Sequence, residues 1–153
     1  MNTDNTDLFM SIDSSYKHSE LTEVIIGVFY EVYNELGFGF LESLYRKALQ
    51  MALQEKGLAV EAEVPVPVFF RGNNVGDFRA DLVVNQLILL ELKTAEAIVI
   101  AYEAQTLNYL RATTLEVGLI LNFGPKAQVR RLLFDNVRKQ VRSHRVGSAF
   151  EPS

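Results

Sequence analysis

Cysteine is absent from the 153-residue chain, and this absence excludes several classes of functional site. Disulfides, zinc–thiolate sites, iron–sulfur clusters and cysteine nucleophiles all need a thiol. Histidine is scarce too, since only His18 and His144 occur, one near each end of the chain. A histidine-rich metal centre is therefore not expected. Carboxylates remain as the main candidate metal ligands.

Long hydrophobic runs are also lacking, because no segment approaches the roughly 20 residues needed to cross a bilayer. The chain begins Met-Asn-Thr-Asp-Asn-Thr-Asp, which is unlike the basic and apolar start of a signal peptide. We therefore predict a cytoplasmic protein with no membrane association. The hydrophobic fraction of 48% and the charged fraction of 22% are ordinary for a globular protein of this kind, and the length suits one domain.

Charge occurs in two hydrophobic segments where a buried strand should carry none. Residues 78–84 contain Asp81, whereas residues 87–92 contain Glu91 and are followed directly by Lys93. An ionised carboxylate is costly to bury unless it is paired or binds a metal. These three charged residues therefore predict a functional site at the ends of two neighbouring strands.

The residues between these segments predict a β-hairpin, since Asn85 and Gln86 are typical of turns. With a three-residue loop, Asp81 lies opposite Glu91 with Cβ atoms roughly 4.5–5.5 Å apart, and Lys93 shares their face. A two-residue loop would shift the register and separate the acids. Two carboxylates this close repel one another, and Mg²⁺ or Mn²⁺ would relieve that repulsion. The alternative is a structural ion pair between Lys93 and the acids, and spacing alone does not decide between them.

Hydrophobic periodicity predicts one domain over residues 19–145, between a flexible arm at residues 1–18 and a tail at residues 146–153. Helices are predicted over residues 19–36, 41–56, 101–112 and 136–145, and strands over 59–63, 66–70, 78–84, 87–92, 117–122 and 129–134. The buried side of the second helix is predicted to contain Leu44, Ala48, Met51 and Ala52. The order predicts an α/β fold with α+β character, in which a mixed central β-sheet is flanked by helices on both faces.

Basic residues gather near the C-terminus although the net charge is −4. They are Lys126, Arg130, Arg131, Arg138, Lys139, Arg142 and Arg145. Such a segment is compatible with nucleic acid as a partner, because phosphate contacts dominate nucleic-acid affinity. A solvated helix face or a disordered tail explains the same pattern, and taken alone the segment favours that explanation.

Two further motifs lie on predicted helices. Glu42 and Tyr45 share a face in the segment Gly39-Phe40-Leu41-Glu42-Ser43-Leu44-Tyr45, although a lone glutamate at a helix start is usually only favourable to the helix dipole. Gln105 and Tyr109 are also one turn apart. Their amide and phenol could hold a phosphate or a base edge, or could form a polar face over the sheet.

Together these residues resemble the GxxExxY family, which belongs to the PD-(D/E)xK, or restriction-endonuclease-like, nuclease superfamily. The resemblance covers roughly residues 20–135 and matches Glu42, Asp81, Glu91, Lys93, Gln105 and Tyr109 in the expected order. Asp81 follows alanine instead of proline, as it does in many members of the superfamily.

The resemblance implies a metal-dependent nuclease that acts on DNA. The catalytic residues would be Glu42, Asp81, Glu91 and Lys93. The ligands of Mg²⁺ or Mn²⁺ would be Asp81, Glu91, the Leu92 carbonyl and Glu42. The residues in contact with nucleic acid would be Gln105, Tyr109 and Tyr45. One alternative is a catalytically silent module that binds nucleic acid or a protein partner. Another is a structural ion-pair cluster in an oligomer, and a homodimer is one candidate assembly.

Overall fold

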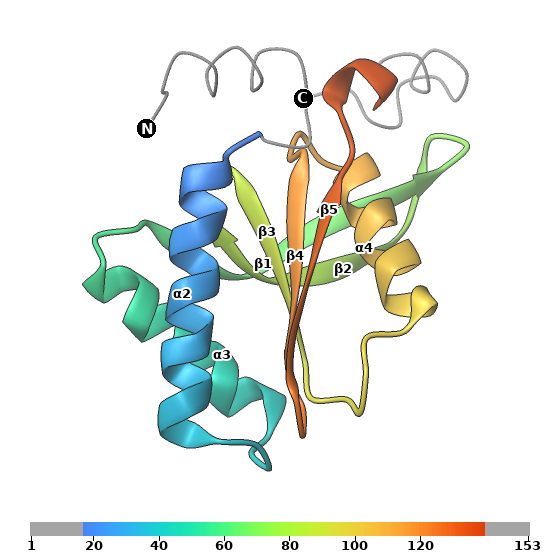
Figure 1. The fold of residues 1–153 in the computed structure, drawn as a ribbon. Coiled ribbons are helices and arrows are strands. Elements are labelled where there is room, and N and C mark those ends of the chain that lie inside the picture. Colours follow the sequence, from blue (N-terminus) through green and yellow to red (C-terminus); the bar gives the residue numbers. More distant parts are fainter. Residues whose placement is uncertain (1–16, 140–153) are drawn as a thin grey trace.

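The computed structural model describes residues 17–139, and these residues form one α+β arrangement (Figure 1). The elements are α2 (Ser19–Leu36), α3 (Glu42–Glu55), β1 (Val60–Phe70), β2 (Asn73–Val84), β3 (Ile88–Lys93), α4 (Ile100–Arg111), β4 (Val117–Phe123) and β5 (Ala127–Leu133). Residues 136–139 are helical, so the predicted helix over 136–145 falls partly outside the described residues. The predicted tail and most of the predicted arm lie outside them as well.

The sheet has five strands in the order β1-β2-β3-β4-β5. Only β3 and β4 run parallel, and the other neighbouring strands are antiparallel. Helices α2 and α3 cover one face, whereas α4 covers the other (Figure 1). The predicted fold class, a mixed sheet flanked by helices on both faces, is confirmed.

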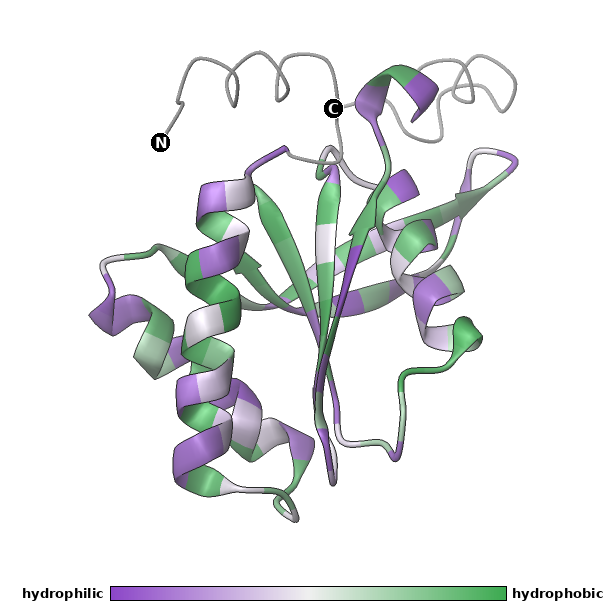
Figure 2. Cartoon of the chain, viewed as in Figure 1, coloured by the Kyte–Doolittle hydropathy of each residue, from purple (hydrophilic) through white to green (hydrophobic). Residues whose placement is uncertain are grey.

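The larger core lies between the sheet and the pair α2 and α3. Figure 2 shows that the central strands are mainly hydrophobic, whereas the helices carry both hydrophobic and hydrophilic residues. Phe29 from α2 and Tyr45 from α3 both pack against Phe123 at the end of β4. This aromatic group fixes the two helices to the strand that follows β3 in the sheet.

The buried side of α3 was predicted only in part, since Ala48 and Ala52 are partly buried against the core. Tyr45, Leu49 and Leu53 are fully buried, whereas Leu44 and Met51 from the predicted side are exposed. The true stripe has strict four-residue spacing and contains the tyrosine, which the sequence argument assigned to the site.

The edge strand β1 also differs from its prediction, because it is continuous where two short strands were expected. Pro65 and Pro67 are tolerated in this edge strand, where one side of the backbone needs no ladder partner. Its irregularities lie instead at Glu63, whose φ is 51°, and between Val68 and Phe69, where the ladder shifts register. The ladder pairs Ala62 with Leu82 and Val64 with Ala80, so the irregular residue lies across from Asp81.

The loop between β2 and β3 has the predicted three residues, because Val84 pairs with Ile88. Asn85 and Gln86 adopt positive φ values of 51° and 56°, as this tight turn requires. The β2–β3 ladder then extends only to Leu82 and Leu90. Beyond that pair the two strands separate, and the residues at the point of separation are Asp81 and Glu91.

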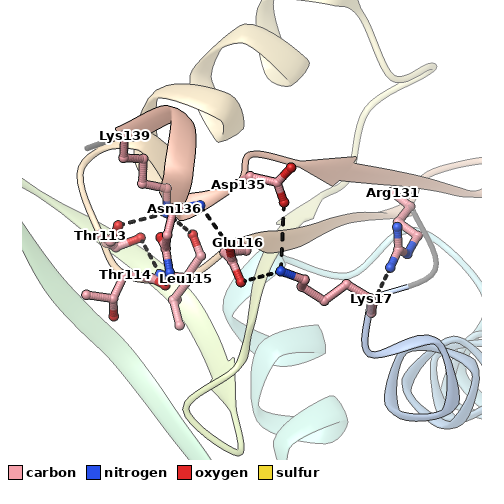
Figure 3. Close-up of polar contacts among 9 residues, drawn as sticks. All are labelled: Lys17, Thr113, Thr114, Leu115, Glu116, Arg131, Asp135, Asn136 and Lys139. Carbon is pink, nitrogen blue, oxygen red and sulfur yellow. Dashed lines mark hydrogen bonds and ion pairs between the residues drawn. The ribbon is translucent and has the colours of Figure 1, made fainter. Parts of the chain in front are cut away.

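A second charged group joins the two ends of the described chain (Figure 3). We call Lys17, Glu116, Asp135 and Lys139 the terminal cluster. Glu116 accepts hydrogen bonds from Lys17 Nζ (2.9 Å) and from the Asn136 backbone N–H (2.7 Å). Lys139 is buried and donates to the carbonyl oxygens of Thr113 and Leu115.

Several residues of the predicted basic segment are therefore engaged within the molecule. Lys139 belongs to the terminal cluster, Arg131 donates to the Lys17 carbonyl, and Arg130 pairs with Glu103 at 2.9 Å. Arg142 and Arg145 lie outside the described residues. These contacts favour a structural role for this part of the segment over contact with nucleic acid.

Candidate active site

The two acids meet where β2 and β3 separate. The Asp81 N–H donates to Glu91 Oε1 at 3.3 Å, and the Leu92 N–H donates to Asp81 Oδ2 at 2.7 Å. Each carboxylate thus accepts from a backbone N–H that lies beyond the last paired residues of the β2–β3 ladder. The spacing therefore correctly predicted that Asp81 and Glu91 would face one another.

Burial gives this acid pair an unusual electrostatic state. Glu91 is only 7% exposed, and burial, followed by the charge of Asp81, raises its pKa to about 8. Burial also raises the pKa of Asp81, although the Leu92 N–H and the positive charges of Arg46 and Lys93 act against it. Two adjacent carboxyls that resist ionisation mark a place where added positive charge would be strongly favoured.

Glu42 approaches the acid pair from the first residue of α3. Its pKa is raised by burial first and by the charge of Asp81 second. Glu42 also contributes to the raised pKa of Glu91. The three acids from α3, β2 and β3 therefore share one electrostatic environment.

Lys93 lies near the acids without pairing directly with them. Its Nζ lies 4.5 Å from the centroid of the Tyr102 ring on α4. Its charge lowers the pKa of Asp81 and of Glu91, yet within residues 17–139 no ion pair joins Lys93 to either acid. The alternative of a direct structural ion pair is therefore not supported.

Helix α4 brings Tyr109 to the same environment. Its ring stacks on Phe78 of β2, and its pKa is raised by burial, then by the charges of Glu91 and Asp81. Gln105 lies one turn earlier and is exposed. Tyr109 thus lies close enough to the acids to feel their charge, and the amide of Gln105 is accessible to solvent.

Tyr45 requires a correction, because the structure does not place it where nucleic acid could reach it. Its side chain is fully buried and stacks on Phe123, with ring centroids 4.3 Å apart. Its hydroxyl donates to the Gly37 carbonyl and accepts from the Phe40 N–H. Tyr45 therefore anchors the loop that leads into Glu42.

Comparison with known families places these features in context. A model of the PD-(D/E)XK nuclease superfamily matches residues 19–132, which include Glu42, Asp81 and Glu91. The chain belongs to the PD-(D/E)XK nuclease superfamily. No curated protein matches the chain. The solved structure described as "Crystal structure of SSO0001" is 20% identical to it, with a TM-score of 0.45, over 88% of this chain and 70% of that chain.

The oxygen donors of this superfamily member fit a hard divalent cation better than any other metal. Asp81 and Glu91 each use one carboxylate oxygen for a backbone N–H, and Glu42 adds a third carboxylate nearby. Among the described residues, however, no three acidic or histidine side chains are already gathered closely enough to hold a metal ion. The acid pair would provide two ligands for such an ion, and Glu42 would reach it directly or through water.

Arg46 is a charged residue of this site that was not predicted from the sequence. Arg46 lies one turn after Glu42, with its NH1 3.9 Å from Asp81 Oδ1 and its NH2 3.7 Å from Glu63 Oε2. The missed signal is the four-residue spacing between Glu42 and Arg46, which puts both on one helix face. Tyr102, beneath Lys93, had no comparable signal.

Proposed function

We propose that this protein is a metal-dependent nuclease that hydrolyses phosphodiester bonds of DNA. The observation that carries the proposal is the acid pair, in which Asp81 and Glu91 are buried side by side with raised pKa values. Such a pair is unfavourable for a purely structural role, because each charge opposes the other. Membership of a nuclease superfamily supports the same conclusion.

The proposed metal ligands are Asp81, Glu91, the Leu92 carbonyl and Glu42, with Mg²⁺ or Mn²⁺ as the ion. A divalent ion at such a site supplies a water of lowered pKa and polarises the scissile phosphate. The protein's own residues hold these groups in place, because the hydrogen bonds at Asp81 and Leu92 fix both carboxylates.

Lys93 is proposed to orient the attacking water or to neutralise charge that develops on the phosphate. The Lys93 ammonium group lies over the Tyr102 ring, so its charge is held near the acids although, within residues 17–139, it forms no ion pair with them. Gln105 and Tyr109 are proposed to contact the nucleic-acid strand beside the acids. The narrower assignment to the GxxExxY family, the cytoplasmic location and a homodimer also remain proposals.

A catalytically silent module that binds nucleic acid or a protein partner is the second candidate. The observation that favours it is that, within residues 17–139, no ready-made group of three metal ligands is present. This candidate predicts binding without turnover. It also predicts that Glu91→Gln leaves binding unchanged.

The proposal is tested with purified protein on linear duplex, circular and single-stranded DNA and on RNA, with Mg²⁺, Mn²⁺ or a chelator. Metal-dependent cleavage of DNA is expected, with loss of cleavage in Glu91→Gln. Glu55→Gln is the matched control, since Glu55 is exposed near the far end of α3. If every DNA form stays intact with either metal, the nuclease proposal fails.

A further inference from the structure

The guanidinium of Arg46 lies beside the acid pair but makes no short hydrogen bond to either acid. Its guanidinium lies between Glu63 and Asp81, at 3.7 Å and 3.9 Å from their carboxylate oxygens. Both distances exceed the range of 2.7–3.2 Å that is typical of N–H···O hydrogen bonds. Within residues 17–139, no hydrogen bond from this guanidinium to a protein acceptor is found.

This arrangement is unusual for a half-buried arginine. The side chain of Arg46 is 23% exposed, so it is partly desolvated, and it carries N–H donors in a fixed fork. An arginine that served only to neutralise Asp81 would gain most from a short bidentate pair. The observed position instead leaves its N–H donors without a short hydrogen bond to any protein acceptor among residues 17–139.

A phosphodiester fits this open fork. Two nonbridging phosphate oxygens match the spacing of two guanidinium N–H groups, as carboxylate oxygens do. When Asp81 and Glu91 share a divalent cation, the negative charge that attracts Arg46 is reduced. The phosphate then becomes the strongest remaining partner for its donors.

We propose that Arg46 binds the nonbridging oxygens of a nucleic-acid backbone phosphate beside the acid pair, and that Glu63 competes with this phosphate for the guanidinium. The inference rests on the proposed nuclease function and extends it by naming a phosphate contact outside the motif residues. Glu63 suits the role of competitor because its side chain is 57% exposed and therefore easily displaced. With a positive φ of 51°, it occupies an irregular position of β1 that lies across from Asp81.

The test measures binding of a short fluorescein-labelled DNA duplex, and of one of its strands, by anisotropy at several salt concentrations. Ca²⁺ replaces Mg²⁺ so that binding can be followed without relying on cleavage. Arg46→Gln is expected to weaken binding about tenfold and to reduce the salt slope by about one. Arg46→Lys should restore the slope but only part of the affinity, because it keeps the charge and loses the fork.

Matched controls separate this contact from a general effect of charge. Lys47→Gln makes the same charge change at the next position of α3, on an exposed side chain, and should leave affinity and slope near wild type. Glu63→Gln should tighten binding by releasing Arg46. The neighbouring exposed Glu61→Gln, which removes the same charge, should tighten it less.

The outcomes distinguish this inference from the proposed function. If wild type cleaves DNA while Arg46→Gln binds with wild-type affinity and slope, the inference fails and the nuclease proposal stands. If wild type binds but never cleaves, and Arg46→Gln still binds weakly with a reduced slope, the inference stands and the nuclease proposal fails. Absence of DNA binding by wild type overturns both. Thermal unfolding of each variant shows whether it is folded, and the Glu63→Gln result tests the competition even if Arg46→Gln is unstable.

Discussion

The acid pair and the terminal cluster are both partly buried charged groups, but their charges are arranged in opposite ways. In the terminal cluster, burial acts to raise the pKa of Glu116, but hydrogen bonds from the Asn136 N–H and Lys17 outweigh it, so the pKa is lowered. In the acid pair, the neighbour of Glu91 is another carboxylate, and the pKa rises to about 8. The neighbours of Glu116 therefore stabilise its ionised form, whereas the neighbouring Asp81 destabilises the ionised form of Glu91.

This difference indicates what each group does. Partnered charges at Lys17, Glu116 and Lys139 tie together segments that lie far apart in the sequence, so they serve the fold (Figure 3). Adjacent like charges at Asp81 and Glu91 oppose folding unless a positive ligand offsets them. Strongly perturbed pKa values of this kind are typical of functional sites.

The largest effect that we expect from changing either the acid pair or the terminal cluster is that of Glu91→Gln. If Glu91 is a metal ligand as proposed, its loss removes several kcal/mol of transition-state stabilisation, so turnover should fall on the order of 10³-fold. The same change removes a buried like charge, so metal-free protein near pH 8 should become more stable. Cleavage rates and chemical denaturation in a chelator measure the two effects, and Glu55→Gln should change neither. If Glu91→Gln lowers the stability and leaves turnover normal, Glu91 has a structural role and the proposed catalytic role is wrong.

Lys93→Ala should give the next largest effect, a fall in turnover of about 10²-fold, because the proposed role of its charge is to stabilise the transition state. Metal and DNA binding should persist. Without metal the acids also lose a favourable neighbour, so stability should fall, and saturating Mg²⁺ should restore most of it by binding the folded state. Thermal unfolding of wild type and variant, with and without Mg²⁺, checks this. A loss of stability that Mg²⁺ does not repair would instead indicate a plain ion-pair role.

The stability of metal-free protein should depend on pH with opposite sign in the two groups. The folded-state pKa of Glu91 is raised from 4.5 to about 8, so the folded state binds the extra proton and the free energy of unfolding falls as pH rises between these values. Burial lowers the pKa of Lys139 from 10.5 to about 8, so its contribution to stability rises with pH between about 8 and 10.5. Denaturation across this range checks both slopes. Glu91→Gln should flatten the first slope alone, and an unchanged slope would refute its assignment to Glu91.

The acid pair could be predicted from sequence because its geometry follows from local rules. The hairpin loop fixes the register of β2 and β3, and the register alone places Asp81 opposite Glu91. The spacing could not show that each carboxylate accepts a backbone N–H, because this depends on the ladder ending at Leu82 and Leu90.

Other features depend on tertiary contacts that no spacing encodes. The terminal cluster joins Lys17 to Glu116, which is 99 residues away, and such pairs have no local signature. Tyr45 was assigned to nucleic acid because it belongs to a motif with Glu42, but Leu49 and Leu53, four and eight residues later, are also buried and show a core stripe. A residue of the motif can therefore serve packing that supports the site.

Glu116→Ala should destabilise the fold by about 1–3 kcal/mol, because it leaves a partly buried N–H and Lys17 without their acceptor. Turnover per folded molecule should be unchanged, in contrast to Glu91→Gln. Equilibrium denaturation and cleavage rates measured on the same sample check both statements. The control is Glu23→Ala on the exposed face of α2, which should be close to neutral. A marked loss of turnover in Glu116→Ala would show that the two charged groups are coupled.

The smallest expected effect is that of Tyr45→Phe, which tests whether packing near Glu42 belongs with the fold or with the site. The ring still stacks on Phe123, but the hydrogen bonds to Gly37 and Phe40 are lost, so stability should fall by about 1 kcal/mol. Because the anchored loop leads into Glu42, Mg²⁺ affinity measured by calorimetry should fall several-fold, within the range of effects typical of groups that orient metal ligands. DNA affinity measured with Ca²⁺ present at saturation should stay near wild type. Weaker DNA binding at unchanged stability and metal affinity would restore the original prediction that Tyr45 contacts nucleic acid directly.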